Sequence, residues 1–144
     1  MRPSLLSVAF GLSACSASHA TPLTETDWTN GQQPCSENRM SFRNGQIAYY
    51  PRGSRPLVMF EIVSFKADAA DPSLTAVVVK PTATVLQEAQ REGLKATGSL
   101  DGIMFFRVTN NRLALVEAGR ADGSNRHPAS PTTSRYFDLI RCPD

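Results

Sequence analysis

The feature that most constrains the fold is an Asn-Gly pair between two runs of alternating apolar and polar residues. Residues 39–43 (RMSFR) and 46–50 (QIAYY) flank Asn44-Gly45. Asn and Gly both accept the left-handed backbone that a two-residue, type I′ turn requires at its central positions. Pairing about this turn gathers the apolar side chains on one face, so the sequence predicts a half-buried antiparallel hairpin. The predicted apolar pairs are Phe42 with Ile47 and Met40 with Tyr49.

Five further segments have the composition of strands, because they are rich in β-branched and aromatic residues and are bounded by turn-forming residues. They span residues 57–65, 74–79, 103–109, 112–117 and 136–140. The third and fourth of them flank Asn110-Asn111, and we expect both asparagines to take φ > 0 in a second hairpin turn. The predicted apolar pairs are Val108 with Leu113 and Phe106 with Leu115.

One segment, residues 84–92, has a helix pattern. Thr84 and Gln87 stand at capping-box spacing, and Gly93 is placed to end the helix. About seven short strands joined largely by hairpins predict a mainly β fold with one short helix, in which an antiparallel sheet curls into a small barrel or sandwich. The length of 144 residues favours a single domain.

The first twenty residues have the layout of an export signal. A short cationic start is followed by a mostly apolar run over residues 5–12 and then by small residues. Within this segment Leu12-Ser13-Ala14-Cys15 resembles the lipobox of bacterial lipoprotein signal peptides. The resemblance implies that Cys15 becomes the lipidated first residue of the mature chain. Because Ser16 rather than Asp follows it, the resemblance also implies that the anchored form goes to the outer membrane. The alternative is cleavage after Ala20, which gives a soluble periplasmic or secreted protein.

The cysteines divide into two groups. Either processing route removes Cys15 from thiol chemistry, and the remaining even pair in an exported chain predicts a disulfide between Cys35 and Cys142. Residues 21–34 are polar and rich in turn formers, so we expect a flexible N-terminal arm there, with Trp28 packing near the disulfide. The single β-rich domain is then predicted over residues 35–144.

Charge and motif content exclude several classes of function. Fifteen Lys and Arg against thirteen Asp and Glu leave a net charge of +2, which is far from the basic excess that nucleic-acid binding usually needs. The chain has two His and lacks the usual nucleophile, zinc, P-loop and EF-hand motifs, so we predict no metal, no cofactor and no catalysis. A small hydrolase that uses Glu61 or Glu88 remains an alternative, provided that the carboxyl is buried in a cleft.

Arginines concentrate in two predicted loops. Arg52 and Arg55 lie in one Pro-rich loop, and Arg126 and Arg135 lie in or beside another. If the loops share one end of a barrel, these arginines would form with Tyr49 and Tyr50 a mouth suited to an anionic or amphipathic ligand or to another envelope protein.

We therefore expect a lipid-anchored, non-catalytic envelope protein that acts by binding. The other possibility is a structural subunit of an envelope complex, which would present an apolar patch around Trp28.

Overall fold

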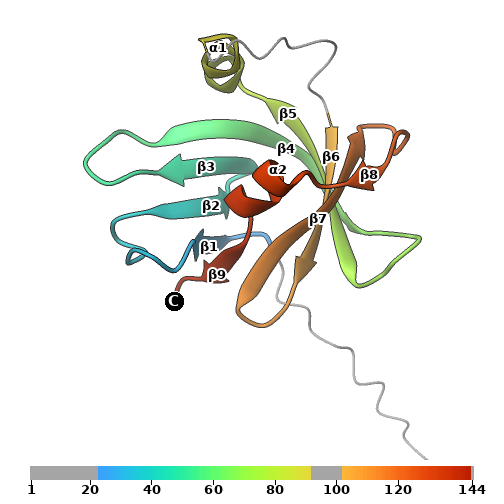
Figure 1. Ribbon diagram of the computed structural model, residues 1–144, viewed down its shortest axis with the longest axis horizontal. Coiled ribbons are helices and arrows are strands. Elements are labelled where there is room, and N and C mark those ends of the chain that lie inside the picture. Colours follow the sequence, from blue (N-terminus) through green and yellow to red (C-terminus); the bar gives the residue numbers. More distant parts are fainter. Residues whose placement is uncertain (1–22, 92–101, 144) are drawn as a thin grey trace, which may run out of the picture.

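Nine strands and two short helices make up the part of the chain that the computed structural model describes, residues 23–91 and 102–143 (Figure 1). In chain order they are β1 (Thr26–Thr29), β2 (Arg39–Arg43), β3 (Gln46–Tyr50), β4 (Leu57–Ala67), β5 (Leu74–Pro81), α1 (Ala83–Arg91), β6 (Gly102–Val108), β7 (Arg112–Arg120), β8 (His127–Pro128), α2 (Pro131–Tyr136) and β9 (Leu139–Arg141). The predicted signal peptide, residues 1–20 with Cys15, lies outside the described residues.

The sheet closes on itself, so the fold is a barrel rather than a sandwich. Its strand order is β6-β5-β4-β3-β2-β1-β9-β7, and the pairing of β6 with β7 completes the ring of eight strands. Every pairing is antiparallel, and the short β8 pairs with the C-terminal part of β7. The structure thus confirms the predicted mainly β, antiparallel fold with one disulfide.

The first hairpin has the predicted register. Phe42 pairs with Ile47 and Met40 pairs with Tyr49. Asn44 and Gly45 have φ of 54° and 68°, which is the left-handed conformation that a type I′ turn requires. Local sequence alone determines this element.

The second hairpin has the predicted register but not the predicted turn. Val108 pairs with Leu113 and Phe106 pairs with Leu115. Neither Asn110 nor Asn111 is among the described residues with positive φ, so the prediction that both asparagines take φ > 0 is wrong. The register shifts between residues 105 and 106, and such a bulge adds the right-handed twist that a mirror-image turn would otherwise supply.

Residues 26–29 form a strand, which corrects the prediction of a flexible arm over residues 21–34. β1 pairs with β2 on one side and with β9 on the other, so it connects the first hairpin to the last strand within the closed sheet. Trp28 is fully buried, and its Nε1–H donates to Thr26 Oγ1 at 2.8 Å. The barrel therefore includes residues that precede Cys35, and Leu23, ahead of β1, is buried as well.

The C-terminal region contains a second helix that the sequence analysis missed. α2 begins after Ser130, whose hydroxyl accepts from the N–H of Thr133, and Pro131 stands in its first turn. The strand predicted over residues 136–140 is correspondingly displaced, because Tyr136 ends α2 and β9 starts only at Leu139. The predicted first helix is confirmed as α1, although its N-terminal hydroxyl is Thr82 rather than Thr84.

The barrel interior holds the main core. Its largest fully buried side chains are Trp28, Phe42, Phe106, Ile47, Leu113 and Val77. Phe106 is central, because its ring meets those of Phe42 and Phe137 edge-on at centroid distances of 5.8 Å and 5.4 Å.

A second, smaller core lies on the opposite face of β5 and β6. It consists of Leu74, Ala76, Ile103 and Phe105, with Val78 and Val116 packed against it. The guanidinium of Arg126 lies 3.8 Å from the centroid of the Phe105 ring, so the loop between β7 and β8 covers this apolar surface.

Candidate functional site

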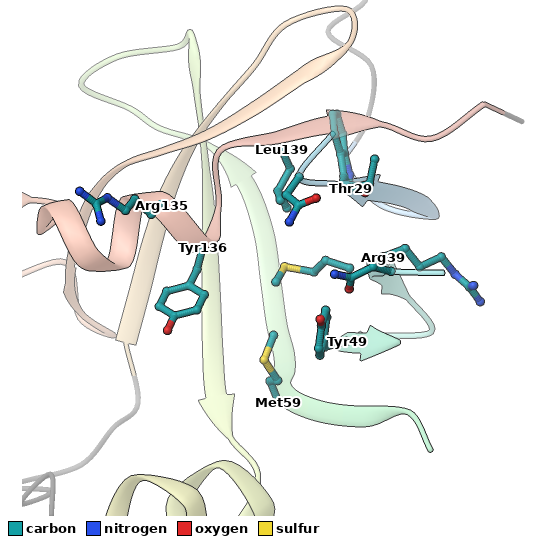
Figure 2. A pocket seen from close by; sticks show the side chains of 11 residues that line it. Thr29, Arg39, Tyr49, Met59, Arg135, Tyr136 and Leu139 are labelled. Atoms are coloured by element: carbon teal, nitrogen blue, oxygen red, sulfur yellow. The ribbon is translucent and has the colours of Figure 1, made fainter. Parts of the chain in front are cut away.

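A cavity of about 320 Å³ lies at one end of the barrel, within the size range of small-molecule sites (Figure 2). It is bounded by the C-terminal ends of β1 and β3, the N-terminal ends of β2, β4 and β9, and by α2. Its lining residues are Trp28, Thr29, Asn30, Asn38, Arg39, Met40, Tyr49, Met59, Arg135, Tyr136 and Leu139.

Rings and thioethers dominate the wall. Trp28 and Leu139 are buried and belong to the main core, so the cavity extends directly from that core. Figure 2 shows Tyr136 of α2 and Tyr49 of β3 on opposite sides of the cavity, with Met59 of β4 between them. Tyr136 is 69% exposed, so this part of the wall is accessible from solvent.

The polar groups of the cavity wall differ in the hydrogen bonds that they already make. Asn30 Oδ1 accepts from the N–H of Gln32 at 3.0 Å, and Thr29 Oγ1 donates to the carbonyl of Gln33 at 3.0 Å. Asn38 Oδ1 is buried and has no hydrogen-bond partner within the described ranges. An unmade hydrogen bond at a buried acceptor costs about 1–3 kcal/mol, and such groups call for an explanation. The Asn38 oxygen is therefore an unsatisfied acceptor that lies out of reach of solvent in the cavity.

The two arginines of the wall do not direct charge into the cavity. Figure 2 shows the Arg39 and Arg135 side chains pointing away from its centre in opposite directions. Arg39 stacks over the Tyr50 ring at 4.2 Å and lies 3.8 Å from the Asp27 carboxylate. The cavity is thus an apolar, uncharged compartment with cations only outside its rim.

Asp27 anchors this outer charge cluster. Burial raises the pKa of its carboxyl, but hydrogen bonds from Arg43 and Ser41 and the charges of Arg43 and Arg39 outweigh burial and hold the pKa below the usual value. The nearest Arg43 contact, from Nε to Oδ1, is 3.0 Å. These groups hold β1 against β2 on the outside of the barrel.

Only two of the six residues predicted to form an arginine-rich mouth line the cavity, namely Tyr49 and Arg135. Tyr50 follows Tyr49 on β3 and lies beneath Arg39. Arg52 is 3.5 Å from the Glu37 carboxylate, and Arg55 is exposed in the same loop. The fold therefore separates most of the predicted set.

Arg126 is the clearest departure from the predicted mouth. Its Nη2 lies 2.7 Å from Asp68 Oδ2, and its Nε contacts the Glu117 carboxylate. Hydrogen bonds that Arg126 donates to these two carboxylates raise the pKa of Arg126, and the bond to Asp68 lowers the pKa of that carboxyl. Arg126 is thus paired with two carboxylates over the second core and does not line the cavity.

The glutamate on which an enzymatic reading depended is exposed. Glu61 lies on β4 with Gln46 and Lys80 as its cross-strand neighbours. Glu88, the other candidate, belongs to α1. The buried carboxyl in a cleft that a Glu61 site requires is not formed.

The predicted disulfide is present. Cys35 and Cys142 are bonded, with their Cα atoms 5.9 Å apart. Over the residues that the structure describes, no group of three or more His, Cys, Asp and Glu is placed to hold a metal ion. Within the same residues, neither helix has the length and apolar character needed to cross a membrane.

Sequence reasoning missed most of the cavity wall. Met40 was predicted on the same face as Tyr49, and that face now forms part of the wall. Trp28, Asn38 and Tyr136 were missed because they come from segments that the sequence analysis assigned to an arm, an unassigned stretch and a strand. The Ser130-Pro131 pair is the signal that could have located α2 and with it the rim of the cavity.

Together these features define a class, a small disulfide-linked antiparallel β-barrel with an apolar cavity at one end. Comparisons with models of known families, with curated proteins and with solved structures found no match.

Proposed function

We propose that this chain is an exported, lipid-anchored bacterial envelope protein that acts as a non-catalytic binding module, with the cavity at the end of the barrel as its ligand site. The cavity carries the proposal, because its volume suits a small molecule and its wall is mainly apolar.

Binding in a cavity is favoured over a structural subunit of an envelope complex by the position of Trp28. A subunit interface was expected to expose an apolar patch around this residue, yet Trp28 is fully buried. The exposed large apolar side chains of the described ranges, Val63, Tyr136 and Ile140, come from three different elements. A Glu61-based hydrolase is disfavoured because that carboxyl is exposed.

The barrel's connectivity fits an anchored carrier. Glu25, just ahead of β1, donates its N–H to the carbonyl of Phe42 and accepts from the N–H of Asn44. The chain thus enters the barrel at the end that carries the first hairpin turn, whereas the cavity lies at the other end. A lipid on Cys15 would thus be linked to the end of the barrel opposite the cavity.

The anchor is tested by metabolic labelling with radioactive palmitate in a bacterial host. We expect label in the wild-type chain and none in Cys15→Ala, which would be recovered in the soluble envelope fraction. Cys15→Ala labelled as strongly as the wild type would exclude anchoring through this residue.

The ligand site is tested by titrating small apolar molecules while the emission of Trp28 is followed. The chain has one Trp, and it lies on the cavity wall, so it is a built-in reporter. Tyr136→Ala should weaken binding by about three- to tenfold through lost contact area. Tyr50→Ala is the matched control, since Tyr50 is absent from the wall, and it should bind like the wild type. Equal effects of the two substitutions would contradict the assignment of the site.

A further inference from the structure

Two tyrosines and a methionine form the apolar part of the cavity wall that a ligand can reach. Trp28 and Leu139 also line the cavity, but both are buried in the main core. Tyr49 and Met59 are only partly buried, and Tyr136 is exposed. Figure 2 shows the two tyrosine rings on opposite sides of the cavity with the Met59 thioether between them. Rings and a flexible thioether favour contact with a compact apolar body.

The polar side-chain oxygens of the wall are bonded or shielded. Thr29 Oγ1 donates to the carbonyl of Gln33, and Asn30 Oδ1 accepts from the N–H of Gln32. Asn38 Oδ1 lies out of reach of solvent in the cavity. These oxygens therefore offer a charged ligand little compensation for the water that it loses on entry.

The charged groups around the cavity do not face its interior. Among the residues that the structure describes, no Asp or Glu lines the cavity, and Figure 2 shows Arg39 and Arg135 directed away from its centre. The Asp27 carboxylate and the Tyr50 ring hold Arg39 in that position. An ion in the cavity gains no partner of opposite charge, and an unpaired charge in apolar surroundings is strongly disfavoured. The wall therefore favours an uncharged molecule over an anion or a cation of the same shape.

The volume of the cavity limits the size of its ligand. A cavity of 320 Å³ corresponds to about ten water molecules at the roughly 30 Å³ that each occupies in the liquid. The same space holds about ten to fifteen non-hydrogen atoms of an organic molecule. One ring with a branched substituent is a body of this size.

We infer that the cavity binds an uncharged, mainly apolar molecule of this size and selects against ions of the same shape. The inference rests on the proposed function and specifies the ligand class of the same site. It replaces the anionic ligand that the arginine content of the sequence suggested.

Three probes of nearly equal shape separate the charge of the ligand from its size. They are 4-tert-butylacetophenone, which is uncharged, 4-tert-butylbenzoate, which is an anion at neutral pH, and 4-tert-butylbenzamidinium, which is a cation. We expect the wild type to bind the ketone at least about tenfold more tightly than either ion, because only the ions lose solvation that the wall does not replace. Isothermal titration calorimetry measures the three dissociation constants.

Met59→Lys tests whether this wall sets the preference. The substitution adds an ammonium group between the two tyrosines, so the benzoate should become the tightest of the three probes and the amidinium should weaken further. Val63→Lys is the matched control, because it adds the same charge to the same strand, β4, at a side chain that is 57% exposed and outside the wall. This control should keep the wild-type order of the probes.

The outcomes separate the ligand class from the ligand site. Binding of none of the three probes would overturn both. Binding of either ion as tightly as the ketone would overturn the ligand class and leave the ligand site standing. A wild-type order that persists in folded Met59→Lys would show that this wall does not set the preference. The order in the wild type needs no variant, so the inference stays testable if Met59→Lys does not fold.

Discussion

Removal of the disulfide is the perturbation whose effect the structure predicts most directly. Cys35 lies in the connection between β1 and β2, and Cys142 follows β9, so the bond joins positions 107 residues apart in sequence. Without it, β9 is held by two register pairs to β1 and by two to β7. The Cys142 N–H also donates to the carbonyl of Asp27 at 2.8 Å. The perturbation is the double substitution Cys35→Ala and Cys142→Ala, which leaves no unpaired thiol.

The expected loss follows from the length of the closed loop. In the chain-entropy description, a bridge over this separation removes about 16 cal/mol/K from the unfolded chain, which is about 4.8 kcal/mol at 25 °C. A domain of this size has a net stability of about 5–15 kcal/mol, so the bridge contributes between a third and nearly all of it. With a urea m-value of roughly 1–3 kcal/mol per M, the unfolding midpoint should fall by about 2–5 M.

The assay is urea unfolding followed through Trp28, which is fully buried in the native barrel and therefore reports its loss. The oxidised wild type, the wild type kept reduced, and the double-Ala variant are compared. The reduced wild type and the variant should agree within about 1 kcal/mol, because both lack the covalent constraint on the unfolded chain. A double-Ala variant that loses less than about 1 kcal/mol with an unchanged m-value would refute the loop-entropy argument.

Two further predictions test the first hairpin and the charge cluster on the outside of the barrel. Gly45→Val should lower the free energy of unfolding by about 1–2 kcal/mol, because φ at this position is +68° and no other atom lies within 4 Å of an added Cβ, so the cost is backbone strain alone. Gly45→Asn, measured in the same urea titration, should cost less because Asn tolerates this conformation, and equal costs would argue against strain. Stability should also fall as the pH drops below about 4: the folded-state pKa of Asp27 lies below its unfolded value, so its contribution is present above the unfolded pKa and is lost as the pH falls through the folded one. Asp27→Asn should flatten this acid limb of the urea midpoint against pH, and an unchanged limb would assign the pH dependence to other groups.

The elements that could be predicted from the sequence are those whose information is local. Asn44-Gly45 specifies a turn, and the alternation on either side specifies a register, so the first hairpin formed as predicted. The second hairpin shows where this reasoning ends. Its apolar pairs were predicted, but its turn and the bulge between Phe105 and Phe106 were not, because nothing in the alternation of residues indicates them.

The elements that could not be predicted depend on distant partners. β1 is four residues long and has no clear alternation, so its composition resembles that of a loop. It becomes a strand because β2 and β9 flank it, and β9 is more than a hundred residues away in sequence. Trp28 is buried only because this closure occurs. The disulfide was predicted from the number of cysteines. The same prediction did not place the residues before Cys35 in the barrel.

The candidate site consists largely of elements that depend on distant partners, which explains why the sequence did not locate it. Arginines are conspicuous in sequence, but Arg126 pairs with Asp68 and Glu117 on the far face of β6, and that pairing is set by the fold. The wall of the cavity instead brings Trp28 of β1 together with Tyr136 of α2, two residues that share no local motif. The residues of a cavity that forms where the first and last elements of a barrel meet come together only when the barrel closes. The proposed ligand is therefore better inferred from the mainly apolar wall of the cavity than from the charge of the chain.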